Sequence, residues 1–187
     1  GEKEGLVFIH PFDDPLVIAG QGTIGLEVIE DVPDLSEILI PLSGGGLAGG
    51  IAYAIKTTGS GAVVTAVSAD KASVMLESIK SGGPVEMNDR NTLASALSGG
   101  IGLDNRYSFD LIRNYVDRHL TVSEKDIAIA MDYAARELHM VVEGGGAVAL
   151  AAMLAKDWGS GNPGKSIAVV LSGGNVSNEF FYNVIKK

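Results

Sequence analysis

Apolar residues along this chain fall into short runs separated by polar and glycine-rich segments. The runs are mostly continuous rather than alternating, which is typical of strands buried on both faces of a parallel sheet. The longer runs predict strands at Leu6–His10, Ile38–Leu42, Ala62–Val67 and Ile167–Leu171. A shorter run predicts a further strand at Leu120–Val122.

Helical signals lie between the predicted strands. Asp14-Pro15 is a favourable helix start, because aspartate caps free N–H groups and proline suits the first turn. The apolar residues that follow it on one face are Val17, Ile24 and Val28. Ser123–Asp126 resembles a capping box, and the residues at helical spacing after it are Ile127, Met131, Ala134 and Leu138. Strand followed by helix, repeated, predicts a doubly wound α/β fold with a mostly parallel sheet and flanking helices.

Length, charge and cysteine content narrow the class of protein. The chain has 187 residues, of which 46% are hydrophobic, and this length predicts a single domain spanning residues 1–187. Its formal net charge of −9 argues against nucleic acid or an anionic membrane as a partner. The longest apolar run, Ala147–Ala155, is much shorter than the roughly 20 residues of a transmembrane helix. The absence of cysteine excludes disulfides and thiolate metal ligands, and it is consistent with a reducing cytoplasm.

The most informative segment is the glycine-rich loop Ser43–Leu47, which follows the predicted strand Ile38–Leu42 and precedes an apolar segment. Small residues at a helix start leave main-chain N–H groups unobstructed, where the helix dipole favours a phosphate. The carboxyl ends of strands are also where open α/β sheets bind ligands. The pattern is neither a Walker loop nor a dinucleotide fingerprint. We therefore predict an anion site; the alternative is a tight turn that needs glycine for close packing. The candidate residues are Ser43, Gly44, Gly45, Gly46 and Leu47.

Other clusters of small residues contain candidate site residues. Ser172 follows the predicted strand Ile167–Leu171, and Glu143 precedes an alanine-rich segment that begins with three glycines. Taken singly, Ser172 is interpreted as a turn residue and Glu143 as a solvated acid at a helix start. The cluster Ser98–Gly102 has no interpretation of its own. The histidines show no metal-ligand spacing and are interpreted as structural or solvated: they are His10, His119 and His139.

Taken together and in order, these segments resemble the fold-type II pyridoxal-phosphate (PLP) enzymes, in particular the serine/threonine dehydratase group. The resemblance spans nearly the whole chain and is carried by Phe8–Pro11, Val17–Ile24, Ser43–Leu47, Glu143 and Ser172–Asn175. Within the group, Thr92–Ala94 and Gly99–Tyr107 look most similar to the ectoine and hydroxyectoine utilisation dehydratases. Ordinary threonine dehydratases carry Ala-Asp-Gly at the position where this chain has Ala94-Ser95-Ala96.

The resemblance implies pyridoxal 5'-phosphate as the cofactor and gives the candidate residues their roles. The main-chain N–H groups of Ser43–Leu47 would bind its phosphate, Ser172 would face the pyridine nitrogen, and Glu143 would lie near the ring. A serine hydroxyl, unlike an aspartate, does not hold that nitrogen protonated. The ring then withdraws electrons less strongly, which favours β-elimination over transamination.

The implied activity is that of a PLP-dependent lyase, a dehydratase or ammonia-lyase. Its substrate would be a small hydroxy amino acid such as threonine or serine, or an ectoine-derived amino acid. Two alternatives remain open: a β-replacement synthase of the same fold, and a non-catalytic fragment that binds a phosphate-bearing ligand. Some relatives bind a divalent cation through an acidic pair, and because Ser68 and Val74 stand at those positions we predict no metal here.

The resemblance also implies that the chain is the larger, C-terminal part of a two-domain cytoplasmic enzyme, with the small domain and the N-terminal segment missing. The full-length form is expected to be a homodimer. Relatives carry the Schiff-base lysine in an upstream Ser-x-Lys element, and no lysine here lies in a family-like setting of that kind. We therefore expect no catalytic residue in this chain, which alone would be inactive. The substrate-carboxylate site is expected largely upstream as well, and Phe12 is assigned equally to the active site or to packing.

Overall fold

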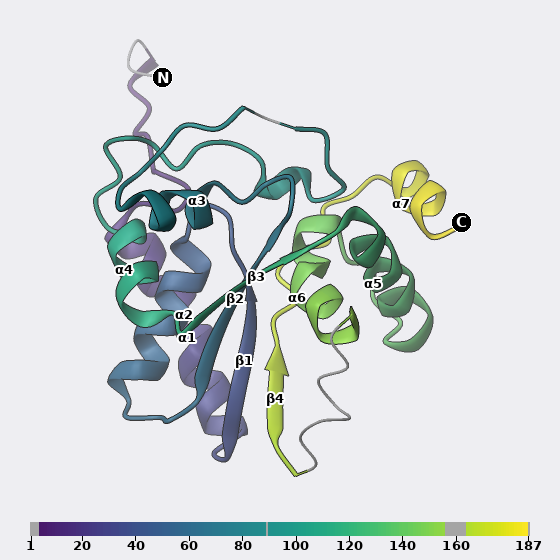
Figure 1. Ribbon diagram of the computed structural model, residues 1–187, viewed down its shortest axis with the longest axis horizontal. Helices are drawn as coiled ribbons and strands as arrows, with labels where there is room; N and C mark the ends of the chain where they lie inside the picture. Colours follow the sequence, from purple (N-terminus) through teal and green to yellow (C-terminus); the bar gives the residue numbers. More distant parts are fainter. Residues whose placement is uncertain (1–3, 89, 156–163, 187) are drawn as a thin grey trace.

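The computed structural model describes residues 4–88, 90–155 and 164–186. Within these residues, four strands form one sheet in the order β3-β2-β1-β4, and every neighbouring pair is parallel. The segments that follow the strands therefore meet at one edge of the sheet (Figure 1). The strands are β1 (Leu35–Pro41), β2 (Val63–Ala69), β3 (Arg118–Val122) and β4 (Ser166–Val169).

Helices cover both faces of this sheet (Figure 1). On one face lie α1 (Pro15–Asp31), α2 (Gly46–Thr57) and α4 (Ser108–Tyr115), and on the other lie α5 (Glu124–Glu137) and α6 (Gly144–Ala155). The shorter elements lie toward the edge where the strands end: α3 (Val74–Ser81), η2 (Ser95–Leu97) and α7 (Asn178–Ile185). The predicted doubly wound α/β fold is confirmed.

Two hydrophobic clusters, one on each face, form the core, and β1 contributes to both. Ile38 and Ile40 are fully buried in the cluster that includes α2, whereas Leu39, between them, is fully buried in the cluster that includes α6. Successive side chains of a strand point to opposite faces. A strand covered on both faces is therefore apolar at nearly every position, which is why the continuous run in the sequence predicted it.

The predicted helix starts are confirmed. The Asp14 carboxylate accepts hydrogen bonds from the N–H groups of Leu16 at 2.8 Å and Val17 at 3.1 Å, at the start of α1. Ser123 and Asp126 form a reciprocal capping box at the start of α5. These local hydrogen bonds depend only on neighbouring residues, so the sequence is sufficient to predict them.

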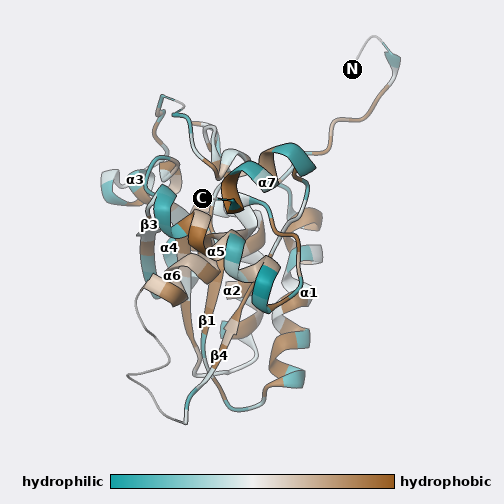
Figure 2. Cartoon of the chain, turned by 90° about the vertical axis from the view of Figure 1, so that its right-hand side faces the viewer, coloured by the Kyte–Doolittle hydropathy of each residue, from teal (hydrophilic) through white to brown (hydrophobic). Residues whose placement is uncertain are grey.

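The predicted strand Leu6–His10 is wrong. This segment is extended but pairs with no strand of the described chain, and Val7 and Phe8 are 86% and 81% exposed. Figure 2 shows the N-terminal segment projecting from the body of the molecule. An apolar run supplies strand propensity, but a strand also needs a neighbouring strand to bond to its main chain.

The other predicted strands are present with shifted ends. In particular, β4 ends at Val169 rather than Leu171, and β3 begins at Arg118, two residues before the predicted run. Two glycine-containing segments, Gly82-Gly83-Pro84 and Gly159–Gly164, have the composition of ordinary surface turns. The first follows α3, with Gly82 in a left-handed conformation. Most of the second lies outside the described residues. No helix in the described part of the chain is long and apolar enough to cross a membrane.

Candidate cofactor site

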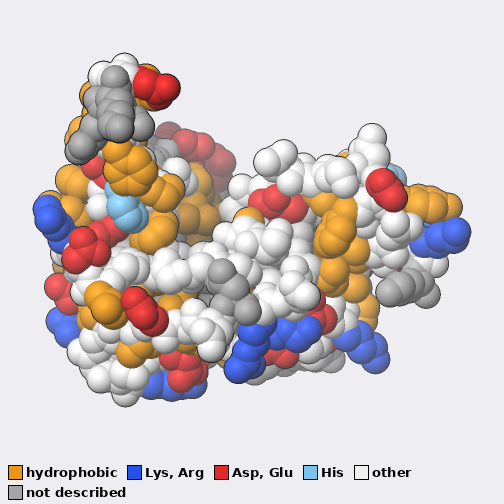
Figure 3. All heavy atoms as spheres, turned by 90° about the horizontal axis from the view of Figure 1, so that it is seen from above, with side chains coloured by type: hydrophobic (Ala, Val, Ile, Leu, Met, Phe, Trp, Pro, Cys, Tyr) orange, Lys and Arg blue, Asp and Glu red, His pale blue; other side chains and the backbone are white. Residues whose placement is uncertain are grey.

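One cavity of about 340 Å³, here called the central cavity, lies where the segments after β1 and β4 meet the start of α6. Figure 3 looks onto this edge of the sheet and shows mostly uncharged surface across its middle. The lining of the central cavity brings together all the residues that the sequence proposed as a site: Ser43, Gly44, Gly45, Gly46, Leu47, Glu143 and Ser172.

The glycine-rich loop enters α2 with its main-chain N–H groups available. Among the described residues, no hydrogen bond uses the N–H groups of residues 43–48 as donors. The first N–H with a partner is that of Gly49, which donates to the Gly45 carbonyl at 2.7 Å. Gly45 has φ of 91°, a left-handed conformation that favours glycine. A run of free donors at the positive end of a helix is suited to an anion.

Close packing also explains some of these glycines, so the alternative interpretation of the loop holds in part. A Cβ on Gly46 would lie 2.7 Å from the Phe12 carbonyl oxygen, and a Cβ on Gly44 would overlap the Phe12 ring. Phe12 lines the central cavity and also packs against His10, with ring centroids 4.6 Å apart. Both roles considered for Phe12, facing the site and packing, are therefore compatible with its position.

Glu143 and Ser172 come together because two glycine-containing segments pack directly against each other. The Glu143 N–H donates to the Gly173 carbonyl at 3.0 Å. A Cβ on Gly146 would lie 2.6 Å from that same carbonyl oxygen, so the first turn of α6 can approach the segment after β4 only with glycine there. Glu143 is half-buried rather than fully solvated, and its carboxylate has no hydrogen-bond partner among the described residues.

The described lysines do not line the central cavity. Lys80 and Lys125 each follow a serine by two positions, but both lie on helices. Lys80 pairs with Glu77 at 2.7 Å and is largely exposed, and Lys125 is exposed in the first turn of α5. Lys3, Lys156 and Lys187 lie outside the described residues.

The positions that carry the acidic pair in some relatives have other partners here. The buried Ser68 hydroxyl donates to the Leu42 carbonyl at 2.9 Å, and Val74 is buried at the start of α3. No group of three or more His, Cys, Asp or Glu side chains in the described part of the chain could hold a metal ion. The absence of a divalent cation stays a prediction.

Two of the histidines, His10 and His119, lie outside the central cavity. His10 Nδ1 accepts a hydrogen bond from the Asp13 N–H at 2.8 Å, which orders the turn before α1. His119, on β3, is half-buried, and this burial lowers the pKa of its imidazole. Its Nε2 atom has no partner within the described residues. Neither histidine lines the central cavity.

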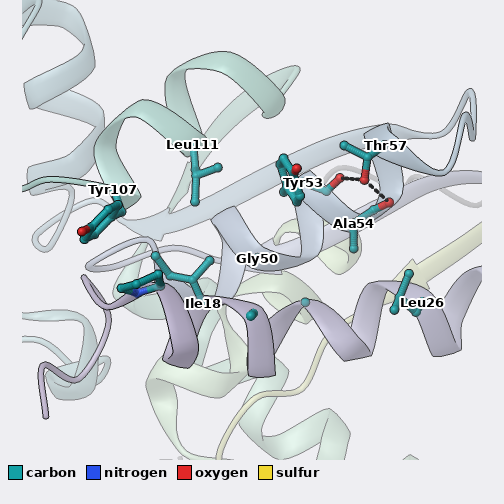
Figure 4. Close-up of a pocket in the computed structure, with 11 residues that line it drawn as sticks. Ile18, Leu26, Gly50, Tyr53, Ala54, Thr57, Tyr107 and Leu111 are labelled. Atoms are coloured by element: carbon teal, nitrogen blue, oxygen red, sulfur yellow. Dashed lines mark hydrogen bonds between the residues drawn. The ribbon is translucent and has the colours of Figure 1, made fainter.

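A larger cavity of about 430 Å³ lies between α1, α2 and α4, away from the predicted site residues (Figure 4). Its lining is almost entirely apolar, with Ile18, Leu26 and Leu111 among its side chains. The Thr57 hydroxyl donates within its own helix, to Tyr53 O at 2.7 Å. Because it lacks free main-chain donors and a charged side chain, this cavity does not fit a phosphate-bearing cofactor.

The sequence pattern of the family described as "Pyridoxal-phosphate dependent enzyme" matches residues 1–173. The chain therefore belongs to this family of PLP-dependent enzymes. The family, the fold and the resemblance to threonine dehydratases were predicted from the sequence motifs, and all three are confirmed.

The individual proteins similar to this chain include enzymes named for reactions of threonine and serine. An L-threonine ammonia-lyase of Thermotoga maritima is 39% identical over 186 residues, 100% of this chain and 45% of that protein. Threonine deaminase isoform 2 of Solanum lycopersicum superposes with a TM-score of 0.89 at 31% identity, covering 99% of this chain and 53% of that one. Maize serine racemase gives a TM-score of 0.86 at 31% identity, over 99% and 56%. The chain spans about half the length of the curated relatives it matches.

Proposed function

We propose that the central cavity holds pyridoxal 5'-phosphate, with the phosphate on the main-chain N–H groups of Ser43–Leu47. The observation that carries this proposal is the convergence of the glycine-rich loop, Glu143 and Ser172 on one cavity, with the loop donors free. These residues fit the cofactor chemically, since the dianionic phosphate needs several donors and the positive end of a helix.

The chain's own residues would then orient the cofactor and set its reactivity. When bound, the cofactor withdraws electrons from the α-carbon of an amino acid. The Ser172 hydroxyl would donate a neutral hydrogen bond to the pyridine nitrogen without holding it protonated. The Glu143 carboxylate, which no described residue engages, would be available to a donor near the ring. A neutral partner at the nitrogen favours loss of a β-leaving group over transamination.

For the whole protein we propose a dehydratase or ammonia-lyase activity. The substrate would be a small hydroxy amino acid, threonine or serine, or an amino acid derived from ectoine. β-Elimination would give an enamine that tautomerises to an imine and hydrolyses to a 2-oxo acid and ammonia. The named activities of the L-threonine ammonia-lyase and threonine deaminase relatives support the first substrate class. The similarity of the Gly99–Tyr107 segment supports the second.

The test is to assay the full-length protein for 2-oxo acid and ammonia. The substrates to compare are serine, threonine, hydroxyaspartate and ectoine-derived amino acids. We expect deamination of at least one of them. Replacement of the β-substituent by an added thiol, with no deamination of any substrate, would assign the protein to the β-replacement synthases instead. Absence of both reactions, with PLP bound, would favour a non-catalytic binding role.

We further propose that the parent protein is a cytoplasmic homodimer whose remaining portion supplies the Schiff-base lysine and the substrate-carboxylate site. The span of about half the length of the curated relatives supports this division, and so does the central cavity, which no lysine of the described residues lines. Light scattering of the full-length protein should give a dimer mass. Peptide mapping after borohydride reduction should place the cofactor-linked lysine outside residues 1–187.

A further inference from the structure

The segment 92–97, here called the wall segment, separates two cavities at the site edge of the sheet. Ala96 and Leu97 line the central cavity. Leu93, Ser95 and Ala96 line a neighbouring cavity of about 240 Å³. Glu143 and the start of α6 line the same neighbouring cavity. The position of the wall segment therefore determines the shape of the central cavity on this side.

The Glu124 carboxylate holds the beginning of the wall segment with both of its oxygens. The Thr92 hydroxyl donates to Oε1 at 2.5 Å, and the Leu93 N–H donates to Oε2 at 2.7 Å. The Thr92 hydroxyl oxygen in turn accepts the Ala94 N–H at 3.1 Å. Hydrogen bonds to an ionised carboxylate are stronger than neutral ones, so Glu124 fixes the residues of the wall segment that precede η2.

Helix capping does not explain this use of Glu124. The N-terminus of α5 is capped by Ser123 and Asp126, whose side chains and main-chain N–H groups bond to each other. Glu124 is the first residue of α5, but both of its carboxylate oxygens point to the wall segment instead. The sequence placed Glu124 inside a capping element, and its contact with residues about 30 positions away is visible only in the fold.

The far end of the wall segment is attached to the glycine-rich loop. The Ser43 hydroxyl donates to the Leu97 carbonyl at 3.1 Å. Between the two ends, Ala94 is fully buried and the Leu93 carbonyl lies so close to Gly144 that a Cβ there would overlap it. The wall segment thus connects α5, the first turn of α6 and the loop proposed to bind phosphate.

We propose that Glu124 is a positioning residue for the cofactor cavity. Through Thr92 and Leu93 it fixes the wall segment, and through Leu97 and Ser43 it keeps the glycine-rich loop in the arrangement that accepts a phosphate. The inference rests on the proposed function of the central cavity as a PLP site. A site held in its binding arrangement before the ligand arrives binds more tightly, because less ordering accompanies binding.

The experiment compares variants of the full-length apoprotein in two measurements. The first is hydrogen exchange of the amides of Leu93, Ala94 and Leu97, whose N–H groups are hydrogen-bonded. The second is the affinity for pyridoxine 5'-phosphate, a cofactor analogue without the aldehyde, whose binding needs no lysine. E124A removes both acceptors and should speed exchange of these amides at least about tenfold and weaken the affinity about five- to tenfold. E124Q keeps the shape and can still accept the Leu93 N–H, so it should recover part of both losses.

D126A is the matched control. It removes the side chain that forms the capping box at the same helix end and should lower the melting temperature, but it removes no partner of Glu124. It should therefore change neither wall-segment exchange nor analogue affinity. Unchanged exchange in E124A, or an equal loss of affinity in D126A, would overturn the proposal. If the wild-type protein does not bind the analogue, the cofactor assignment fails, and exchange in E124A still decides whether Glu124 holds the wall segment.

Discussion

Asp13 connects two parts of the molecule that are far apart in the sequence. Its Oδ1 atom accepts the N–H groups of Tyr107 and Ser108, each at 2.9 Å, and its Oδ2 atom accepts that of Arg106 at 2.7 Å. Asp13 thereby caps α4, while its neighbour Asp14 caps α1. The sequence predicted the Asp14 cap because its partners are adjacent, but a partner about 90 positions away leaves no local signal.

Replacing Asp13 with asparagine should give a pH-dependent loss of stability. Burial acts to raise the pKa of Asp13, but the hydrogen bonds from Ser108, Arg106 and Tyr107 and the nearby His10 lower it overall. A lowered folded-state pKa means that the ionised carboxylate stabilises the fold above its unfolded pKa of about 3.9. This contribution is lost as the pH falls through the folded value. D13N should cost about 1–2 kcal/mol at pH 7 and progressively less below about pH 4.

Urea unfolding at pH 7 and at about pH 3.5 measures this difference. D110N is the matched control, because Asp110 lies in the first turn of the same helix and, among the described residues, pairs only with Arg113 at the surface, at 2.8 Å. An exposed pair of this kind contributes less than about 1 kcal/mol. A cost of D13N that is equal at both pH values would contradict the role of the ionised carboxylate.

At the scale of elements, the sequence predicts the strands that are buried on both faces of the sheet. It fails where a segment forms a strand only if a neighbouring strand is available to pair with it. The central strand β1 has fully buried Ile38, Leu39 and Ile40, so its apolar run is unambiguous. The edge strand β3 begins with the exposed Arg118 and the half-buried His119, so the apolar run identifies only its end. Leu6–His10 is as apolar as a strand but has no partner in the described chain, and composition cannot reveal that.

The packing of α1 on α2 depends on glycines that the sequence did not single out for this purpose. Gly50 lies in α2 against the main chain of α1. A Cβ there would overlap the Ile18 carbonyl oxygen and lie 2.9 Å from the Gly22 nitrogen. Gly25 similarly faces the Ile51 carbonyl, with a Cβ distance of 2.9 Å. Since both sides of these contacts are main chain, neither helix can yield by a rotamer change.

G50A should therefore destabilise the protein although alanine is the better helix former. The overlap with main-chain atoms should cost close to the upper end of about 1–3 kcal/mol, which outweighs the gain of up to about 1 kcal/mol from helix propensity. G20A is the control: Gly20 lies in α1 with no atom within 4 Å of an added Cβ, so it should stabilise by about 0.5–1 kcal/mol. Chemical denaturation of both variants measures the difference, and equal effects of the two substitutions would rule out the close-contact explanation.

At the scale of the whole molecule, the candidate site is assembled from segments that the sequence identified one by one. The loop Ser43–Leu47 was found from its small residues after a buried strand. Glu143 and Ser172 gained their roles only from the order of motifs, because taken singly each was interpreted as an ordinary surface residue. Ser172 meets the loop because the parallel sheet brings the segments after β1 and β4 to the same edge. Glu143 joins them because its N–H donates to the Gly173 carbonyl. The attachment of the wall segment to Glu124 had no sequence signal.

The 187-residue chain alone should bind PLP without forming a Schiff base at one specific lysine. A reactive lysine must reach the cofactor aldehyde and be activated by desolvation or a neighbouring charge. Lys56 is held away from the central cavity: it pairs with Asp117 at 2.6 Å and donates to the Ala62 carbonyl at 2.9 Å, and these partners lie where β2 and β3 begin. Lys80 is paired with Glu77 on the surface of α3. No lysine among the described residues lines the cavity that would present the aldehyde.

Borohydride reduction of the chain with one equivalent of PLP, followed by peptide mass spectrometry, tests this. We expect weak modification spread over exposed lysines and no activity toward serine or threonine. The full-length protein, treated in the same way, is the control and should carry one stoichiometric modification outside residues 1–187. A single lysine of the 187-residue chain that is modified stoichiometrically would show that this chain holds its own Schiff-base residue. The central cavity would then need a different orientation of the cofactor from the one proposed.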